Sequence, residues 1–160
     1  MTTGAWIVLA AVAVAVGFGS WRLATDGRFR GTHALSRASE APAVGTRFES
    51  APGGSDPQPA GARLVATIGG RLGERATLLQ FSSAFCAPCR ATRRVLGEVT
   101  GLVEGVAHIE VDAEHHLEAT RAFSISRTPT TLVLDARGVE VTRATGAPTR
   151  AQVLTAVGLA

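Results

Sequence analysis

The sequence predicts one α/β domain, built on a mixed β-sheet with helices on both faces, preceded by a long apolar helix. Strand-like and helix-like patterns alternate from residue 62 to the C-terminus. Residues 2–21 are mostly apolar and carry no charge, and the stretch after them is rich in Pro, Gly, Ser and Ala. We therefore expect a short tail (1–4), a transmembrane helix (5–21), a flexible linker (22–61) and one folded domain (62–160).

The apolar segment has the flanks of a membrane anchor. Trp6 and Trp21 stand at its two ends, where interfacial aromatic belts lie. A cleaved signal peptide is the rival interpretation, but no Lys or Arg precedes the apolar run. Basic residues follow it, at Arg22, Arg28 and Arg30, so the positive-inside rule predicts a single-pass protein with a cytoplasmic domain. The extracytoplasmic face is the alternative.

The elements of the domain follow from hydrophobic periodicity. We expect strands at 63–68, 76–82 and 106–111, helices at 87–99 and 114–123, a hairpin of strands 130–134 and 139–143, and a final helix at 149–157. The hairpin turns across Asp135 to Gly138. Parallel and antiparallel strands with intervening helices give a mixed sheet covered on both faces.

Composition excludes several classes of function. The net charge is +3, and no dense cluster of Arg with interleaved aromatic residues occurs, which argues against nucleic-acid binding. Two cysteines are too few for a disulfide framework, so a redox role or a metal-binding role remains for them. The alternative is that both are inert buried thiols. A zinc site would need two more ligands, and the four histidines are scattered. We expect neither a metal nor a cofactor.

The two cysteines, Cys86 and Cys89, stand three apart where a strand pattern gives way to a helical one. If a helix begins at Cys86, both sulfurs lie on one face within reach of a disulfide. The unpaired N–H groups and the positive end of the helix dipole then favour a Cys86 thiolate. Cys86 is therefore the expected nucleophile. Pro88 suits the first helical turn, which does not need its missing N–H.

The segment FSSAFCAPCR and the later run SRTPTTLVLDARG resemble the active-site strand with its CxxC motif and the cis-proline segment of the thioredoxin superfamily. Phe85 stands where the family usually has Trp. Gly146 matches the family's glycine near the substrate groove. The resemblance covers residues 62–160 and implies a thioredoxin-like fold. The Thr-Pro-Thr-Thr sequence is most similar to the TlpA-like branch, which consists of bacterial membrane-tethered thiol-disulfide reductases. The spacing between the active-site helix and the cis-proline segment is, however, that of plain thioredoxin.

The resemblance implies roles for individual residues. Cys86 attacks a substrate disulfide, and Cys89 resolves the mixed disulfide that forms. Pro129 is expected to be cis, which leaves the backbone of Thr128 open to pair with a substrate peptide. Phe85, Pro88 and Gly146 complete the groove.

Two positions bear on proton transfer. Gln80 stands where thioredoxins carry a buried acid, and His108 stands where they carry the lysine that pairs with it. A neutral imidazole at His108 is suited to take over proton handling. The alternative is a partly exposed histidine at the start of a strand.

These observations predict a membrane-tethered thiol-disulfide oxidoreductase that reduces protein disulfides. We expect a monomer whose partners are disulfide-containing proteins or a redox donor protein. The alternative function is a thioredoxin-fold binding or scaffold module for a membrane partner, with little redox turnover.

Overall fold

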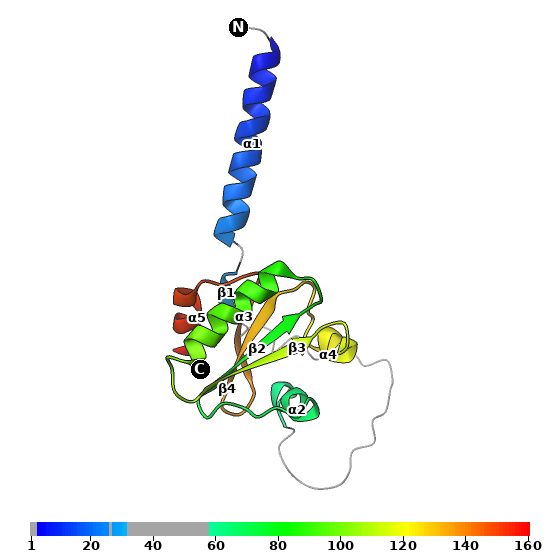
Figure 1. The fold of residues 1–160 in the computed structure, drawn as a ribbon, viewed down its shortest axis with the longest axis vertical. Helices are drawn as coiled ribbons and strands as arrows, with labels where there is room; N and C mark the ends of the chain where they lie inside the picture. The colour runs from blue at the N-terminus through cyan, green and yellow to red at the C-terminus, as the bar shows by residue number, and fades with distance from the viewer. Residues whose placement is uncertain (1–2, 26, 32–57) are drawn as a thin grey trace.

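A computed structural model of the chain describes residues 3–25, 27–31 and 58–160, and its sheet has the strand order β1-β5-β4-β2-β3 (Figure 1). The strands are β1 (Phe29–Gly31), β2 (Ala76–Ser82), β3 (Val106–Asp112), β4 (Thr130–Asp135) and β5 (Glu140–Thr145). The helices are α1 (Thr3–Thr25), α2 (Ala60–Thr67), α3 (Ala87–Thr100), α4 (Leu117–Ala122) and α5 (Arg150–Val157). The predicted mixed sheet is confirmed, because β2 runs parallel to β3 and antiparallel to β4.

Strand β2 lies inside the sheet, and all seven of its residues are buried. Its side chains alternate between two apolar cores, as the period of two in a strand requires. Leu78 packs with Leu96 and Val99 of α3 and with residues of α5. Leu79 and Phe81 pack on the opposite face with Val65 of α2. The sheet is therefore covered on both faces, as predicted.

The predicted strand at 63–68 is wrong, because this segment is helix α2. Its Val, Thr and Ile residues favour a strand by propensity, but packing decides otherwise. Gly61, Ala62 and Val65 are buried with helical spacing, and Arg63 is exposed. The helix thereby covers one face of the sheet with its apolar side.

Part of the predicted linker belongs to the sheet. Strand β1 pairs antiparallel with β5, with Phe29 opposite Ala144. The N–H of Gly27 donates to the carbonyl of Thr145 at 2.8 Å. The boundary drawn at residue 62 is therefore too late for this strand. The linker predicted at 22–61 is also wrong at its two ends, because residues 22–25 belong to α1 and residues 60–61 to α2. Residues 32–57 of the predicted linker lie outside the described residues.

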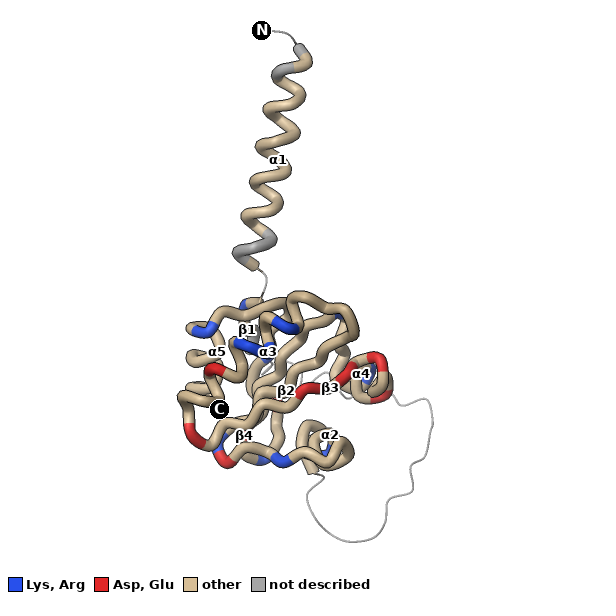
Figure 2. Tube along the Cα trace, in the orientation of Figure 1, with Lys and Arg blue, Asp and Glu red and all other residues tan. Residues whose placement is uncertain are grey.

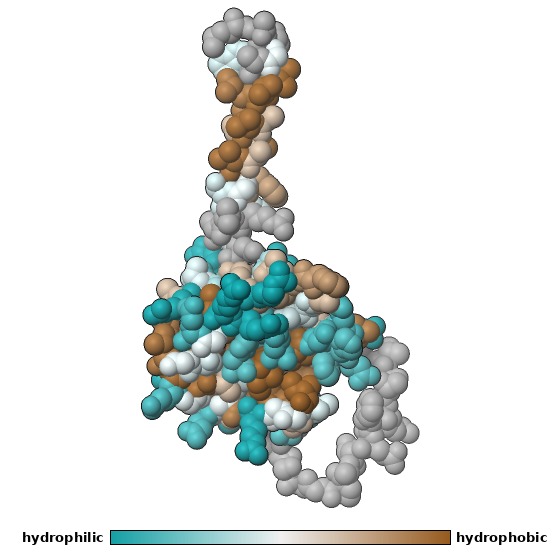
Figure 3. Space-filling view, viewed as in Figure 1, coloured by the Kyte–Doolittle hydropathy of each residue, from teal (hydrophilic) through white to brown (hydrophobic). Residues whose placement is uncertain are grey.

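Helix α1 forms over the predicted apolar segment, and its large apolar side chains, from Trp6 to Trp21, are exposed (Figure 3). Among the residues that the structure describes, however, no helix combines the length and the apolar character needed to cross a bilayer. The prediction of a transmembrane helix at 5–21 is therefore not supported. The predicted cellular location is not tested and stays a prediction.

The remaining elements agree with the sequence, with shifts that local hydrogen bonds explain. The helix expected from residue 114 begins at Leu117, because the Asp112 carboxylate accepts the N–H of Glu114 at 2.8 Å and holds a turn there. Helix α5 begins after Thr149, whose hydroxyl accepts the N–H of Gln152 in a capping box.

Candidate active site

The candidate site begins where β2 ends and α3 starts. After Ser82 the chain turns through residues 83–85, and Cys86 is the N-cap of α3. Phe85 has φ of 58° and a fully exposed side chain. Bulky residues rarely adopt this left-handed conformation, and such outliers often mark functional turns. The turn places Cys86 at the N-terminus of α3, where the first N–H groups of a helix have no partner within the helix itself.

Cys86 and Cys89 form a disulfide, with their Cα atoms 5.2 Å apart. The prediction that a helix start brings the two sulfurs together is confirmed. Cys89 is 2% exposed, whereas Cys86 is only half-buried, so the two sulfurs differ in access to a partner. The N–H of Cys89 donates to the Sγ of Cys86 at 3.1 Å. Pro88 occupies the first turn, as predicted.

The proline loop lies next to this turn. The Thr128–Pro129 bond is cis, as predicted. The hydroxyl oxygens of Ser83 and Thr128 are 2.9 Å apart and share a hydrogen bond, which ties the loop before the cysteines to the loop before β4. The N–H of Gly146 donates to the carbonyl of Pro129 at 2.8 Å. These two bonds bring together the segments that carry the predicted groove residues.

Behind Cys89 the buried amide of Gln80 organises a polar network. Its Nε2 donates to the carbonyl of Cys89 at 3.0 Å and to the Oγ of Ser82 at 2.7 Å. Its Oε1 lies 3.1 Å from the Nε2 of His108. The structure therefore brings Gln80, His108 and Cys89 together. His108 lies near the start of β3, is half-buried and lies beside Gln80. Its role in proton handling stays a prediction.

The network continues to an ion pair. Glu110 pairs with Arg93 of α3, with two N–O distances of 2.6 Å (Figure 2 shows basic residues on α3 and acidic residues on β3). Burial alone raises the pKa of Glu110, but the hydrogen bonds from Arg93 and Ser82 and the nearby positive charge outweigh it, and the net pKa is lowered. Burial lowers the pKa of His108, and the Arg93 charge lowers it further against the opposing effect of Glu110.

Sequence reasoning missed Ser82, Ser83 and Glu110. A signal existed for Glu110, because it stands two residues after His108 and so shares its face of the strand. No signal in the sequence connects Ser83 with Thr128. A pocket of about 340 Å³ adjoins the network, lined by Ser82, Ser83, Ala84, Arg93, Glu110 and Asp112.

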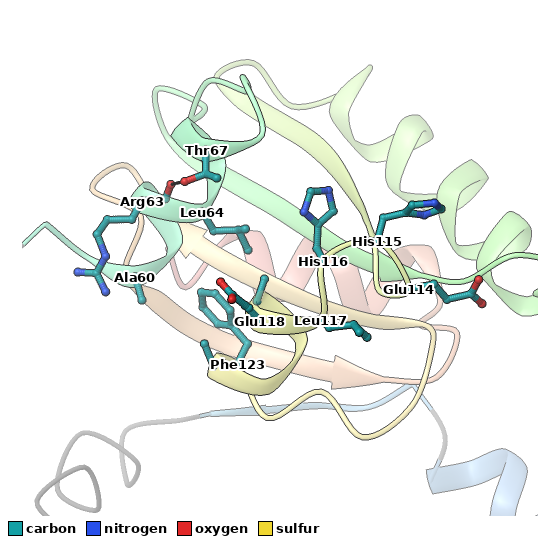
Figure 4. A pocket seen from close by; sticks show the side chains of 12 residues that line it. Ala60, Arg63, Leu64, Thr67, Glu114, His115, His116, Leu117, Glu118 and Phe123 are labelled. Atoms are coloured by element: carbon teal, nitrogen blue, oxygen red, sulfur yellow. Dashed lines mark hydrogen bonds between the residues drawn. The ribbon is translucent and has the colours of Figure 1, made fainter. Parts of the chain in front are cut away.

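A second pocket, of about 600 Å³, lies between α2 and α4 (Figure 4). Leu64 and Phe123 supply apolar lining, and His116 and Glu118 supply polar lining. None of its lining residues belongs to the cysteine or proline loops. Over the described ranges, no group of three or more His, Cys, Asp and Glu residues is placed to hold a metal ion. His115 is exposed and pairs with Asp112.

Comparison with known proteins agrees with this geometry. The sequence matches the thioredoxin family over residues 71–158. It is 34% identical to thioredoxin H2-1 of Oryza sativa subsp. japonica over 70 residues, which make up 44% of this chain and 50% of that protein. The chain thus spans about half the length of this curated relative.

Solved thioredoxin structures are among the matches. A reduced Schistosoma mansoni thioredoxin pre-protein has a TM-score of 0.49 and 21% identity, with 60% of this chain and 85% of that chain covered. A Fasciola hepatica thioredoxin has a TM-score of 0.49 and 22% identity, with 60% and 86% covered. The family match extends over more than half of the chain and includes both cysteines and the cis-proline. The chain therefore belongs to the thioredoxin family.

Proposed function

We propose that the protein is a thiol-disulfide oxidoreductase that reduces disulfides in other proteins. The observation that carries the proposal is the asymmetry of the Cys86–Cys89 pair. Cys86 is accessible and accepts a backbone N–H at a helix start, and Cys89 is buried behind it. One sulfur is thus placed to attack a partner protein and the other to act only within the site.

The chemistry follows from this asymmetry. With the disulfide first reduced by a donor dithiol, the Cys86 thiolate attacks a substrate sulfur, and the substrate disulfide breaks to leave one substrate thiolate. The Cys89 thiolate then attacks Cys86 in the mixed disulfide, which re-forms Cys86–Cys89 and releases the second substrate thiolate. Two electrons pass from the protein to the substrate, and the substrate thiolates take protons from water.

The groove residues supply recognition. The Thr128 backbone precedes a cis-proline whose carbonyl is held by Gly146. An extended substrate peptide pairing with Thr128 in the manner of an added strand would present its disulfide to Cys86. Backbone pairing gives affinity without strong sequence preference, which suits a reductase of varied proteins. The more detailed resemblance to the TlpA-like branch stays a prediction, as does the monomeric state.

The test is reduction of insulin by the full chain in the presence of dithiothreitol. The full chain is needed, because a fragment from residue 62 would lack β1. We expect faster precipitation of insulin than with dithiothreitol alone, and complete loss of the difference in Cys86→Ser. A full chain no faster than dithiothreitol alone would favour the scaffold function instead.

A further inference from the structure

The hydrogen atoms around Gln80 have one consistent arrangement. The carbonyl of Cys89 only accepts, so the group of Gln80 that faces it must be the NH₂. The same NH₂ group also donates to the Oγ of Ser82, so both hydrogens of the Gln80 amide are used. The amide oxygen of Gln80 therefore faces His108 and accepts from it. In the neutral imidazole the proton is on Nε2, and Nδ1 carries the free lone pair.

This arrangement leaves His108 able to change charge. Protonation occurs at Nδ1, and the bond from Nε2–H to the Gln80 oxygen persists in both charge states. A carboxylate at position 80 would hold the imidazole in its charged form, whereas the neutral amide does not. Gln80 thus fixes the ring without fixing its charge.

The charged groups that face His108 come from two elements. Glu110 shares strand β3 and favours the imidazolium, and Arg93 of α3 opposes it. On the neighbouring strand β2, the residues in reach are the neutral Leu78, its register partner, and Gln80. Because Arg93 and Glu110 pair with each other, their effects on His108 partly cancel. Gln80 is the one side chain between this ring and the backbone of Cys89, so the ring is placed to respond to charge that forms on the cysteine pair.

We propose that His108 is the redox-linked proton site of the Cys86–Cys89 couple, with Gln80 as its positioning residue. Reduction breaks the Sγ–Sγ bond with two electrons from a donor dithiol, which becomes a disulfide. The two protons released by the donor are shared among Cys86, Cys89, His108 and water. Negative charge on the reduced cysteine pair favours a proton on His108, and this proton leaves when the disulfide re-forms.

The coupling must act in both directions. If reduction increases the affinity of His108 for a proton by some factor, a proton on His108 favours the dithiol over the disulfide by the same factor. A tenfold change corresponds to a shift of one pKa unit. The inference rests on the proposed function, because it requires a disulfide that cycles.

The test is NMR titration of the histidine ring protons in the full chain, in the disulfide form and after reduction with a phosphine. We expect the pKa of His108 to rise on reduction. A pKa of His108 that is the same in both forms overturns the proposal. A Gln80→Leu variant, which removes the bridge, should lose most of the redox-dependent difference.

A second measurement checks reciprocity and separates this inference from the proposed function. The disulfide–dithiol equilibrium against dithiothreitol is measured across pH for the full chain, for His108→Gln and for the control His116→Gln. The pH dependence lost in His108→Gln should equal the factor from NMR, and His116→Gln should follow the parent. Equal curves for all three overturn the proton site even if insulin is reduced. A disulfide that the phosphine fails to open, as shown by thiol counting, overturns the proposed function itself.

Discussion

The hydroxyl oxygens of Ser83 and Thr128 lie 2.9 Å apart, and their hydrogen bond joins two loops that are 45 residues apart in sequence. One loop carries Cys86 and the other carries the cis-proline. Neither loop is a regular element, so a direct bond between them restrains the distance between nucleophile and groove more than the sheet alone does.

Removal of this bond should weaken catalysis more than folding. In Ser83→Ala the Thr128 hydroxyl is part-buried and loses its partner, at a cost of about 1 kcal/mol. We expect insulin reduction to slow by up to about fivefold, because a hydrogen bond of this strength changes a rate constant by that order. The control is Ser126→Ala, an exposed serine in the same loop as Thr128, which should keep the parent rate. Equal rates for both variants would contradict a role for the bond.

Gly27 holds the N-terminal strand against the domain. Its φ is +73°, and a Cβ there would clash with the carbonyl oxygen of Ala147. Gly27→Ala should therefore lower the free energy of unfolding by about 1–3 kcal/mol, from backbone strain and displacement of the 147–148 segment. The measurement is urea denaturation of the full chain.

Gly97→Ala is the matched control for that substitution. Gly97 lies within α3 and is exposed, and a Cβ added there would meet no atom within 4 Å. Alanine should stabilise the helix there by about 0.5–1 kcal/mol. Opposite signs for the two Gly→Ala changes are expected, and a harmless Gly27→Ala would show that the β1 contact contributes little.

The sequence predicts those elements of the fold that a short run of residues encodes. A mostly apolar run marks the buried strand β2, and the apolar residues of 130–134 mark β4. Strand β1 has no such signal. Phe29 is its one large apolar residue, and its partner Ala144 is more than a hundred residues away. Its pairing depends on a free edge of β5, which no short stretch of sequence encodes.

The site shows the same division. Cys86, Cys89 and Pro129 are found from a motif and its spacing, and the resemblance to thioredoxins points to Gln80 and His108. The bond between Ser83 and Thr128 arises from two loop conformations, neither of which has a sequence signature. At this site the contacts between loops are therefore what the sequence does not predict.

The ion pair of Glu110 should make stability depend on pH. The pKa of the Glu110 carboxyl is lower in the folded chain than in the unfolded chain, where it has its ordinary value. The stabilisation that Glu110 gives is therefore fully present when the pH is above its unfolded-state pKa, and it is lost as the pH falls through its folded-state pKa.

Glu110→Gln should therefore destabilise the protein at pH 7 by about 1 kcal/mol or less, because Arg93 is half-exposed. The difference from the parent should shrink as the pH falls below the unfolded-state pKa of Glu110. Urea denaturation at pH 7, 5 and 3 measures it, with Glu98→Gln, an exposed position on α3, as control. A constant difference at all three pH values would show that the carboxylate charge is not what stabilises.

The difference in burial between the two cysteines predicts which single substitution traps a partner. In Cys89→Ser the accessible Cys86 still attacks a substrate disulfide, but no second sulfur resolves the product, so a mixed disulfide should accumulate. In Cys86→Ser the remaining sulfur, that of Cys89, is 2% exposed and lies behind the helix start, so this variant should form little or no mixed disulfide.

The measurement is non-reducing electrophoresis after incubation with insulin, with dithiothreitol added to half of each sample to show that the adduct is a disulfide. Adduct from Cys86→Ser in preference to Cys89→Ser would reverse the assignment of the nucleophile. Equal adduct from both would mean that the buried sulfur reaches partners through local opening of α3, and the asymmetry of the folded site would then not determine the order of attack.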